Sequence, residues 1–166
     1  MDRIHSFPPV ESSTAKILIL GSMPGKESLR AVEYYAHPRN AFWRIMGELI
    51  GASPDMPYDA RIQLLKSSKI ALWDVLASCS RSGSLDADIV ADSITPNDFS
   101  SFFLSHPHIT HVFFNGAKAE QCFMKYVIPT LEIEYLHCQR LPSTSPAHAS
   151  ITYAEKLEVW RAIQNI

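Results

Sequence analysis

The chain has 166 residues, 46% of them hydrophobic, and a formal net charge of -2. This length matches one domain, and the apolar share is enough to bury a core without disulfides or metals. The charge excludes a broadly basic, nonspecific nucleic-acid binder, so a nucleic-acid partner would need a local patch and helix ends.

The predicted elements alternate between strands and helices after an irregular arm at 1–15. Short apolar runs predict strands at 16–21, 69–75, 110–116 and 131–137. Helical spacing and caps predict helices at 40–50, 59–68, 95–106, 117–127 and 151–164, with loops at 22–39 and 79–89. This order predicts a single domain, 1–166, with an α/β fold. We expect a three-layer α/β/α sandwich with a four-stranded, mostly parallel sheet.

Three polar loops are expected to meet at the carboxyl edge of this sheet. The segments GSMPGKESL and YYAHPRN follow the first strand, Asn115-Gly116 ends the third, and LPSTSPAHAS follows the fourth. Ligands of open parallel sheets bind at this edge. The sequence therefore predicts one crevice lined by hydroxyl, amide and aromatic groups.

The motifs GSMPG, YYAHPRNAFW, FFNG and LPSTSPAH resemble those of the uracil-DNA glycosylase superfamily. Their spacing is similar to that of the mismatch-specific uracil and thymine branch. YYAHPRNAFW and PSTSPA are most similar to the hypoxanthine-DNA glycosylase branch. The resemblance covers nearly the whole chain. It implies a monofunctional DNA glycosylase of base-excision repair that hydrolyses the N-glycosidic bond of hypoxanthine, or of uracil, in DNA.

One position departs from the family pattern. Met23 stands where the mismatch-specific branch has Asn and other branches have Asp, and a thioether cannot position or deprotonate a water. The resemblance to the hypoxanthine branch implies that Asn40 is the catalytic residue, although Asn40 also precedes an apolar helix and could be only its N-cap. A carboxamide is a poor base, so we expect slow turnover that depends on stabilising the leaving base.

An everted base needs a face to stack on and groups that read its edge. Tyr35 matches the family's aromatic residue and is the expected platform, with Tyr34 as the alternative; either could instead pack on the core. Asn115 is expected to read the base edge, because its carboxamide complements the adjacent acceptor and donor of hypoxanthine and uracil. The rest of the expected base pocket is Gly21, Ser22 and Met23.

The segment PSTSPAHAS resembles the family loop that clamps the DNA backbone and wedges into the duplex. Its hydroxyl groups suit phosphate oxygens, and its histidine suits a wedge or a backbone contact. A local cationic rim is expected from Lys26, Arg30, Arg39 and Arg140, and His37 either fixes its loop or donates to the sugar or base. The expected DNA-binding residues are Ser143, Thr144, Ser145, His148 and Arg39.

The remaining patterns bear on compartment and cofactors. Cys79, Cys122 and Cys138 form no CxxC pair, and in HPHITH at 106–111 a proline separates two of the histidines at a helix end, so we expect no metal and no cofactor. MDRIHSFPPV lacks the apolar run of a signal peptide, and no segment is apolar for long enough to cross a membrane. The sequence predicts a cytoplasmic monomer that binds DNA containing a deaminated base and contacts no membrane.

Two other functions stay open. With Met23 lacking a polar group, the chain could recognise a damaged base without cleaving it, and a gel shift without product formation would favour that reading. An enzyme of free nucleosides is the third reading. The long PSTSPAHAS loop disfavours it, because a free nucleoside has no duplex to wedge.

Overall fold

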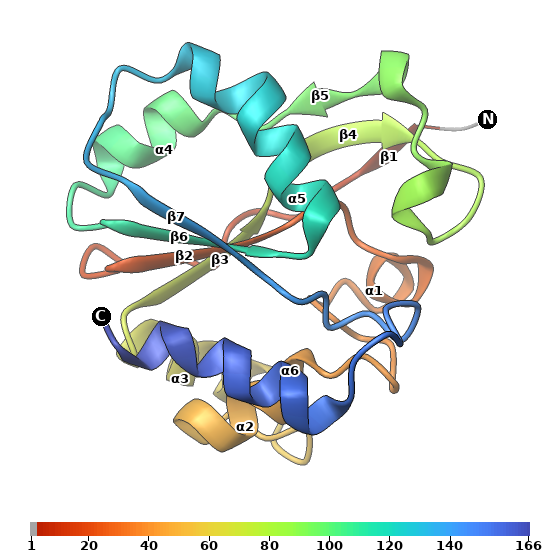
Figure 1. Ribbon diagram of the computed structural model, residues 1–166, viewed down its shortest axis with the longest axis vertical. Helices are drawn as coiled ribbons and strands as arrows, with labels where there is room; N and C mark the ends of the chain where they lie inside the picture. Colours follow the sequence, from red (N-terminus) through yellow and green to blue (C-terminus); the bar gives the residue numbers. More distant parts are fainter. Residues whose placement is uncertain (1–2) are drawn as a thin grey trace.

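The computed structural model describes residues 3–166, and a parallel four-stranded sheet forms its centre (Figure 1). The strand order is β3-β2-β6-β7, with bounds Ile70–Asp74, Ile17–Gly21, His111–Asn115 and His137–Leu141. The register places Gly21 beside Asp74, and Asn115 beside Leu141, so these strand ends share one edge. The predicted sandwich with four parallel strands is confirmed.

Helices cover both faces of this sheet (Figure 1). One face carries α2 (Phe42–Ile50), α3 (Tyr58–Ser67) and α6 (Tyr153–Trp160); the other carries α4 (Phe99–Ser105) and α5 (Ala117–Cys122). Side chains of a strand alternate between faces, so Leu18 and Leu20 of β2 enter one apolar core while Ile17 and Ile19 enter the other. No helix among residues 3–166 is long and apolar enough to cross a membrane.

A second sheet, which the sequence did not predict, lies beside α4 and α5. It is antiparallel, in the order β1-β4-β5, with bounds Arg3–His5, Leu76–Ser80 and Thr95–Pro96. The arm at 1–15 is therefore not irregular throughout, and the loop expected at 79–89 begins inside a strand; residues 1–2 lie outside the described part. Only Val75 separates β3 from β4, so no turn signal marks the change of sheet.

The start of one predicted helix is wrong, and one short helix was missed. Thr95 and Pro96 lie in β5 instead of opening a helix, and α4 begins after Asp98, whose carboxylate accepts a hydrogen bond from the Ser101 N–H at 3.1 Å. A carboxylate at this position accepts a hydrogen bond from an otherwise unpaired N–H, and its negative charge interacts favourably with the positive end of the helix dipole. The expected loop 22–39 also contains the short helix α1, Lys26–Ala31.

The fourth strand lies later in the chain than predicted. Residues 131–136 form no strand, and β7 begins at His137. The alternation in LEIEYL has another cause, because Leu131, Ile133 and Leu136 pack on the core on the α5 side of the sheet. The chain from α5 reaches that segment through Phe123–Val127, a π-helical turn, and the 3₁₀ helix Ile128–Thr130. After α6, a 3₁₀ helix at Arg161–Gln164 follows.

Candidate active site

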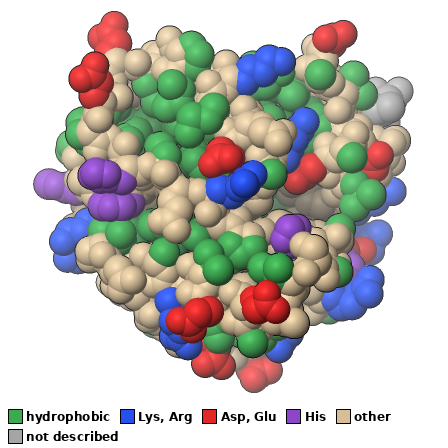
Figure 2. Space-filling view, in the orientation of Figure 1, with side chains coloured by type: hydrophobic (Ala, Val, Ile, Leu, Met, Phe, Trp, Pro, Cys, Tyr) green, Lys and Arg blue, Asp and Glu red, His purple; other side chains and the backbone are tan. Residues whose placement is uncertain are grey.

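A cavity of about 940 Å³ opens at the carboxyl edge of the parallel sheet. Figure 2 shows the surface hollowed where, in Figure 1, α1, the start of α5 and the loop after β7 approach one another. The volume falls within the range of about 300–1,000 Å³ that is typical of small-molecule sites. The structure brings the predicted catalytic, base-binding and DNA-binding residues to its wall: Gly21, Ser22, Met23, Tyr34, Tyr35, Arg39, Asn40, Asn115, Ser143, Thr144, Ser145 and His148.

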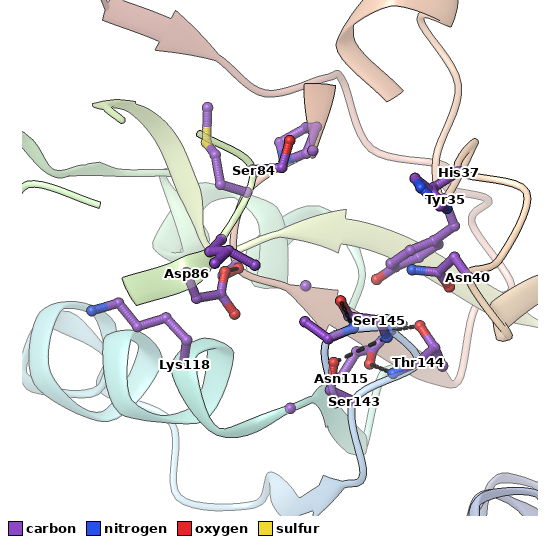
Figure 3. A pocket seen from close by; sticks show the side chains of 18 of the residues that line it. Tyr35, His37, Asn40, Ser84, Asp86, Asn115, Lys118, Ser143, Thr144 and Ser145 are labelled. Atoms are coloured by element: carbon purple, nitrogen blue, oxygen red, sulfur yellow. Dashed lines mark hydrogen bonds between the residues drawn. The ribbon is translucent and has the colours of Figure 1, made fainter. Parts of the chain in front are cut away.

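Tyr35 presents its ring and its hydroxyl group to this cavity (Figure 3). The ring stacks on Phe42 with centroids 4.2 Å apart and an interplanar angle of 26°. The backbone of Tyr35 has φ = 55°, a left-handed conformation that bulky residues rarely adopt and that often marks functional sites. The buried hydroxyl makes no hydrogen bond within residues 3–166, and burial raises its pKa, so it stays a donor.

Tyr34 is held by packing. It is 5% exposed, and its ring packs edge-to-face against Phe7, with the two ring centroids 5.3 Å apart. Its hydroxyl donates to the Pro8 carbonyl at 2.8 Å, and its own carbonyl accepts from Trp43 Nε1 at 2.8 Å. The bonds to the arm and to α2 give it a structural role, so Tyr35 is the better candidate for a platform.

Asp74, at the end of β3, is the main site residue that sequence reasoning missed. It lines the cavity, is 3% exposed, and its Oδ2 has no hydrogen-bond partner among the described residues. Gly21 makes room for it. A Cβ on Gly21 would lie 2.5 Å from Asp74 Oδ1 and 2.9 Å from the Tyr35 hydroxyl. Glycine therefore lets two buried polar groups approach the same point at the sheet edge.

The carboxyl group of Asp74 has a pKa well above the ordinary value of such a group. Burial and then the negative charge of Asp86 raise its pKa to about 7, against a smaller lowering by Arg81. Asp86, in contrast, is exposed. Its Oδ1 accepts a hydrogen bond of 2.5 Å from the Ser22 hydroxyl, and its side chain points into the cavity (Figure 3). Two carboxyl groups in such different environments suit different chemical roles.

Met23 also lines the cavity, but it belongs to the apolar core on the α5 side and is 7% exposed. The position that carries a polar residue in related branches is therefore a packing position in this chain. Ser22, the residue before Met23, holds the Asp86 carboxylate at this cavity through its hydroxyl group.

Because Met23 acts through packing, Met23→Leu is expected to keep base release within about threefold of the unchanged protein, since volume-conserving swaps usually cost less than about 1.5 kcal/mol. Met23→Asn is expected to lower the free energy of unfolding by about 1–3 kcal/mol, because it buries an amide.

We also expect Met23→Asn to add uracil release. Denaturant unfolding and rates on both bases test this, and a large loss in Met23→Leu would show that the thioether has a chemical role.

Asn115, at the end of β6, fastens the loop that follows β7. Its Nδ2 donates to Thr144 Oγ1 and its Oδ1 accepts from the Thr144 N–H, both at 2.9 Å (Figure 3). Each carboxamide atom keeps one further hydrogen-bonding position. Base reading by Asn115 thus stays a prediction, and the structure adds a positioning role.

Thr144 was expected to contact phosphate; its side chain is buried and bonded to Asn115 in this structure, and the phosphate contact stays an untested prediction. It is 1% exposed, and its carbonyl accepts from the Ala41 N–H at 3.0 Å, so it joins the loop to the start of α2. Lys156 of α6, a second missed residue, donates to the His148 carbonyl at 2.6 Å, and burial lowers its pKa. The half-exposed Ser143, Ser145 and His148 remain candidates for DNA contact.

Of the two roles that the sequence left open for Asn40, the structure shows the one at the start of α2, and the catalytic role stays a prediction. Its Oδ1 accepts a hydrogen bond from the Phe42 N–H at 2.9 Å, so it satisfies a free donor at the start of α2. Because the carboxamide oxygen is engaged by this bond, the carboxamide NH₂ group is the part of Asn40 that points toward the cavity (Figure 3). The oxygen retains a second lone pair that can orient a water.

The cationic rim is smaller than predicted. Lys26 and Arg39 line the cavity together with Lys118, which the sequence did not single out. Arg30 pairs with Glu27 at 3.0 Å and Arg140 with Glu120 at 3.7 Å, and neither lines the cavity.

His37 fixes its loop, because its Nδ1 accepts from the Arg39 N–H at 3.0 Å. The neutral ring then carries its proton on Nε2, which can donate within the cavity. Within residues 3–166, no three His, Cys, Asp or Glu side chains gather to hold a metal ion. In the HPHITH segment, both ring nitrogens of His106 are engaged, by the Phe102 carbonyl at 2.7 Å and by Glu11 at 3.3 Å.

An open parallel sheet with a cavity of about 940 Å³ at its carboxyl edge is the arrangement in which α/β proteins of this kind bind their ligands. The profile of the uracil DNA glycosylase superfamily matches residues 8–164. The chain belongs to this superfamily.

Two similar proteins and one similar solved structure come from Methanosarcina. A hypoxanthine DNA glycosylase of Methanosarcina acetivorans is 38% identical over 160 residues, 96% of either chain. A hypoxanthine DNA glycosylase of Methanosarcina barkeri is 43% identical over 116 residues, 69% of this chain and 72% of the relative. A solution NMR structure of a candidate uracil DNA glycosylase from Methanosarcina acetivorans superposes with a TM-score of 0.78 at 34% identity, covering 98% of this chain and 99% of that one.

Proposed function

We propose that this protein is a DNA glycosylase that removes hypoxanthine from deoxyinosine sites in DNA, an early step of base-excision repair. One observation carries the proposal. Oδ2 of the buried Asp74 and the Tyr35 hydroxyl have no hydrogen-bond partners within residues 3–166, and both residues line a cavity large enough for a purine nucleotide. The names of the two Methanosarcina relatives support hypoxanthine as the first choice.

Binding begins with eversion of the damaged nucleotide, because its glycosidic bond is out of reach inside the duplex. Tyr35, supported from behind by Phe42, is the proposed face on which the base stacks. Such stacking contributes about 1–3 kcal/mol, which offsets much of the few kcal/mol needed to unstack a base. The cations at the cavity, Lys26, Arg39 and Lys118, attract the phosphates on either side.

Asp74 is the proposed group that stabilises the leaving base. Cleavage of the N-glycosidic bond leaves negative charge on the base, which spreads to the O6 carbonyl of hypoxanthine. A protonated carboxyl group donates a strong hydrogen bond to such an oxygen in a water-poor site. The position of its pKa near 7 keeps a large protonated fraction available at neutral pH.

The sugar loses electrons as the bond breaks, so it develops positive charge. An ionised Asp86 facing the cavity stabilises that charge through space. Asn40 is proposed to orient the water that attacks the sugar, through the lone pair its Phe42 bond leaves free. A carboxamide cannot deprotonate that water efficiently, so slow turnover is expected.

A panel of oligonucleotides tests the function. Each carries one deoxyinosine or one deoxyuridine, single-stranded or opposite each normal base, and alkali cleaves the abasic product. We expect release from deoxyinosine to be the fastest, with uracil second. Protein carrying Asn40→Ala, purified in parallel, controls for contaminating glycosylases.

Each failure of the panel has a distinct meaning. Absence of product from both bases contradicts the enzyme proposal, and a gel shift without product would identify a damaged-base-binding module. Faster release of uracil would instead place the chain with the mismatch-specific enzymes. Activity on free deoxyinosine but not on DNA would identify a nucleoside hydrolase.

A further inference from the structure

The loop that follows β4 forms one wall of the cavity. Residues 84–87 line the cavity, and Asp86, which begins the 3₁₀ turn Asp86–Asp88, is among them (Figure 3). A bridge between Arg81 and Ile89 closes the base of this loop. The position of the Asp86 carboxylate therefore depends on what holds the closed loop against the rest of the cavity wall.

Arg81 joins this loop to the turn after β2. Its Nη2 donates to the Pro24 carbonyl and its Nε donates to the Gly83 carbonyl, both at 2.6 Å. The rigid fork of N–H donors on a guanidinium suits such a double contact, which the single ammonium of lysine cannot reproduce. Because Arg81 is only 5% exposed, water has little access to replace these two bonds.

Two further hydrogen bonds link the same two segments. Ser84 Oγ accepts from the Lys26 backbone N–H at 3.0 Å, and the Ser22 hydroxyl donates to Asp86 Oδ1 at 2.5 Å. Ser84 and Asp86 are exposed, whereas Arg81 is buried. Exposed hydrogen bonds compete with water, so the bonds of Arg81 are the protected attachment of this loop.

The guanidinium also carries a charge that its own hydrogen bonds do not cancel. Both acceptors are neutral carbonyl oxygens, and Nη1 has no hydrogen-bond partner within residues 3–166. Burial lowers the pKa of Arg81, and four acidic groups oppose that lowering: Cys79, Asp86, Asp88 and Asp74. An arginine stays protonated across the pH range in which proteins work. The cavity wall thus holds a fixed positive charge among its carboxyl groups.

We propose that Arg81 is a positioning residue for base release, which fastens the Asp86 loop to the turn after β2 and keeps a positive charge within reach of Asp74. The inference rests on the proposed function, because it concerns the placement of the two carboxyl groups that the reaction uses. Arg81 does not line the cavity, so it acts through these groups and not on the substrate.

Two substitutions separate the contact from the charge. Arg81→Lys keeps a cation without the guanidinium fork, and Arg81→Met fills similar space without a charge. Each is expected to lower the single-turnover rate of hypoxanthine release at pH 6 by about tenfold or more, because a shift of about 1 Å in an active site can cost about 100-fold. Arg161→Met is the matched control, since Arg161 pairs with Glu158 at 3.3 Å and does not line the cavity. Its rate should stay within about twofold of the unchanged protein, as is usual for surface substitutions.

The pH profile gives a readout that a purely structural role would not move. The charge of Arg81 lowers the pKa of Asp74, so its removal should move the alkaline loss of base release to higher pH. A loosened loop takes Asp86 away and has the opposite effect, but it does so in both variants. The midpoint of Arg81→Met should therefore lie at higher pH than that of Arg81→Lys. Both variants retain the other groups that interact with this carboxyl: Asp86, Tyr34 and Tyr35.

Equal midpoints in the two variants, or midpoints in the reverse order, would overturn the proposal. So would an unchanged rate of hydrogen exchange at the Lys26 amide, which donates to Ser84 and should exchange faster in both variants once the loop is loosened. Circular dichroism and Tm establish that each variant is folded. If Arg81→Met does not fold, Arg81→Gln supplies the neutral side chain for the same comparison.

Failure of the proposed function is recognised separately. It would appear as an absence of base release by the unchanged protein, whatever residue 81 is. The comparison of midpoints is then made without substrate, on the pH titration of the Asp74 carboxyl ¹³C signal in NMR spectra of the two variants. A higher midpoint in Arg81→Met than in Arg81→Lys supports the role of Arg81, and coincident titrations contradict it.

Discussion

Asn40→Ala is expected to lower the single-turnover rate of hypoxanthine release by about 100-fold or more, the loss typical when one oriented polar group is removed from an active site. The same change removes the acceptor for the Phe42 N–H. We therefore also expect the free energy of unfolding to fall by about 0.5–2 kcal/mol, as for the loss of a helix cap. Rapid-quench kinetics and denaturant titration measure the two effects independently.

Asn40→Asp separates the chemical role from the capping role. A carboxylate still accepts from the Phe42 N–H and opposes the dipole of α2, so stability should not fall. It also keeps an acceptor for water, so we expect Asn40→Asp to retain much more activity than Asn40→Ala. An Asp variant as inactive as the Ala variant would show that the amide N–H matters, and full activity of a folded Ala variant would refute the assignment of Asn40.

Replacement of Asp74 gives the second large effect. Asp74→Ala removes the donor to the leaving base, and we expect the rate to drop by about 100-fold. Asp74→Asn has the shape of the protonated carboxyl group and keeps both a donor and an acceptor, so its rate at pH 6 should stay within about tenfold of the unchanged protein. Equal losses in both variants would contradict the role of a neutral donor.

The pH dependence follows from the same group. Because the pKa of Asp74 is about 7, the unchanged protein should lose base release as pH rises through 7, while Asp74→Asn should not. The charged groups that shift the pKa of this carboxyl are Asp86 and Arg81 from the adjoining loop, and its charge in turn raises the pKa of the Tyr35 hydroxyl. Rate profiles of the two proteins between pH 5.5 and 9 compare this directly.

Stability should change with pH in a related way. The ordinary carboxyl pKa of 3.8 is raised to about 7 in the folded protein, so between these values the folded state binds the proton more tightly than the unfolded chain. The free energy of unfolding therefore falls as pH rises across this window. An amide does not ionise, so Asp74→Asn should not lose stability in this pH window. The Tm of Asp74→Asn minus the Tm of the unchanged protein should therefore be larger at pH 8 than at pH 5.

Sequence patterns predicted the site where short motifs follow buried strands. The aromatic and amide groups at Tyr35, Asn40 and Asn115 were expected in one crevice, and all three line the cavity. Sequence patterns did not identify Asp74 or Lys156 as site residues, because an acidic residue at the end of an apolar strand and a lysine on an amphipathic helix are usually solvent-exposed. Only the tertiary fold shows that both are buried.

One strand prediction failed because an alternating pattern of apolar residues arose from packing on the core and not from strand pairing. The alternating residues 131–136 matched a strand, yet they pack on the core without pairing. HCQRL, with four exposed residues in five, forms the edge strand β7. A one-sided edge strand carries little apolar signal, so periodicity cannot find it. The second sheet was missed for a related reason, since its strands are short.

The anchoring of the loop after β7 by Asn115 from one side and Lys156 from the other has a consequence for substrate choice. A segment that is already fixed loses little conformational entropy when DNA arrives. Distortion then falls on the nucleic acid, whose stiffness varies with its sequence. The rate of base release should consequently rise with the deformability of the DNA duplex around the damaged base. Weakly paired and flexible sequence contexts are then the fastest substrates.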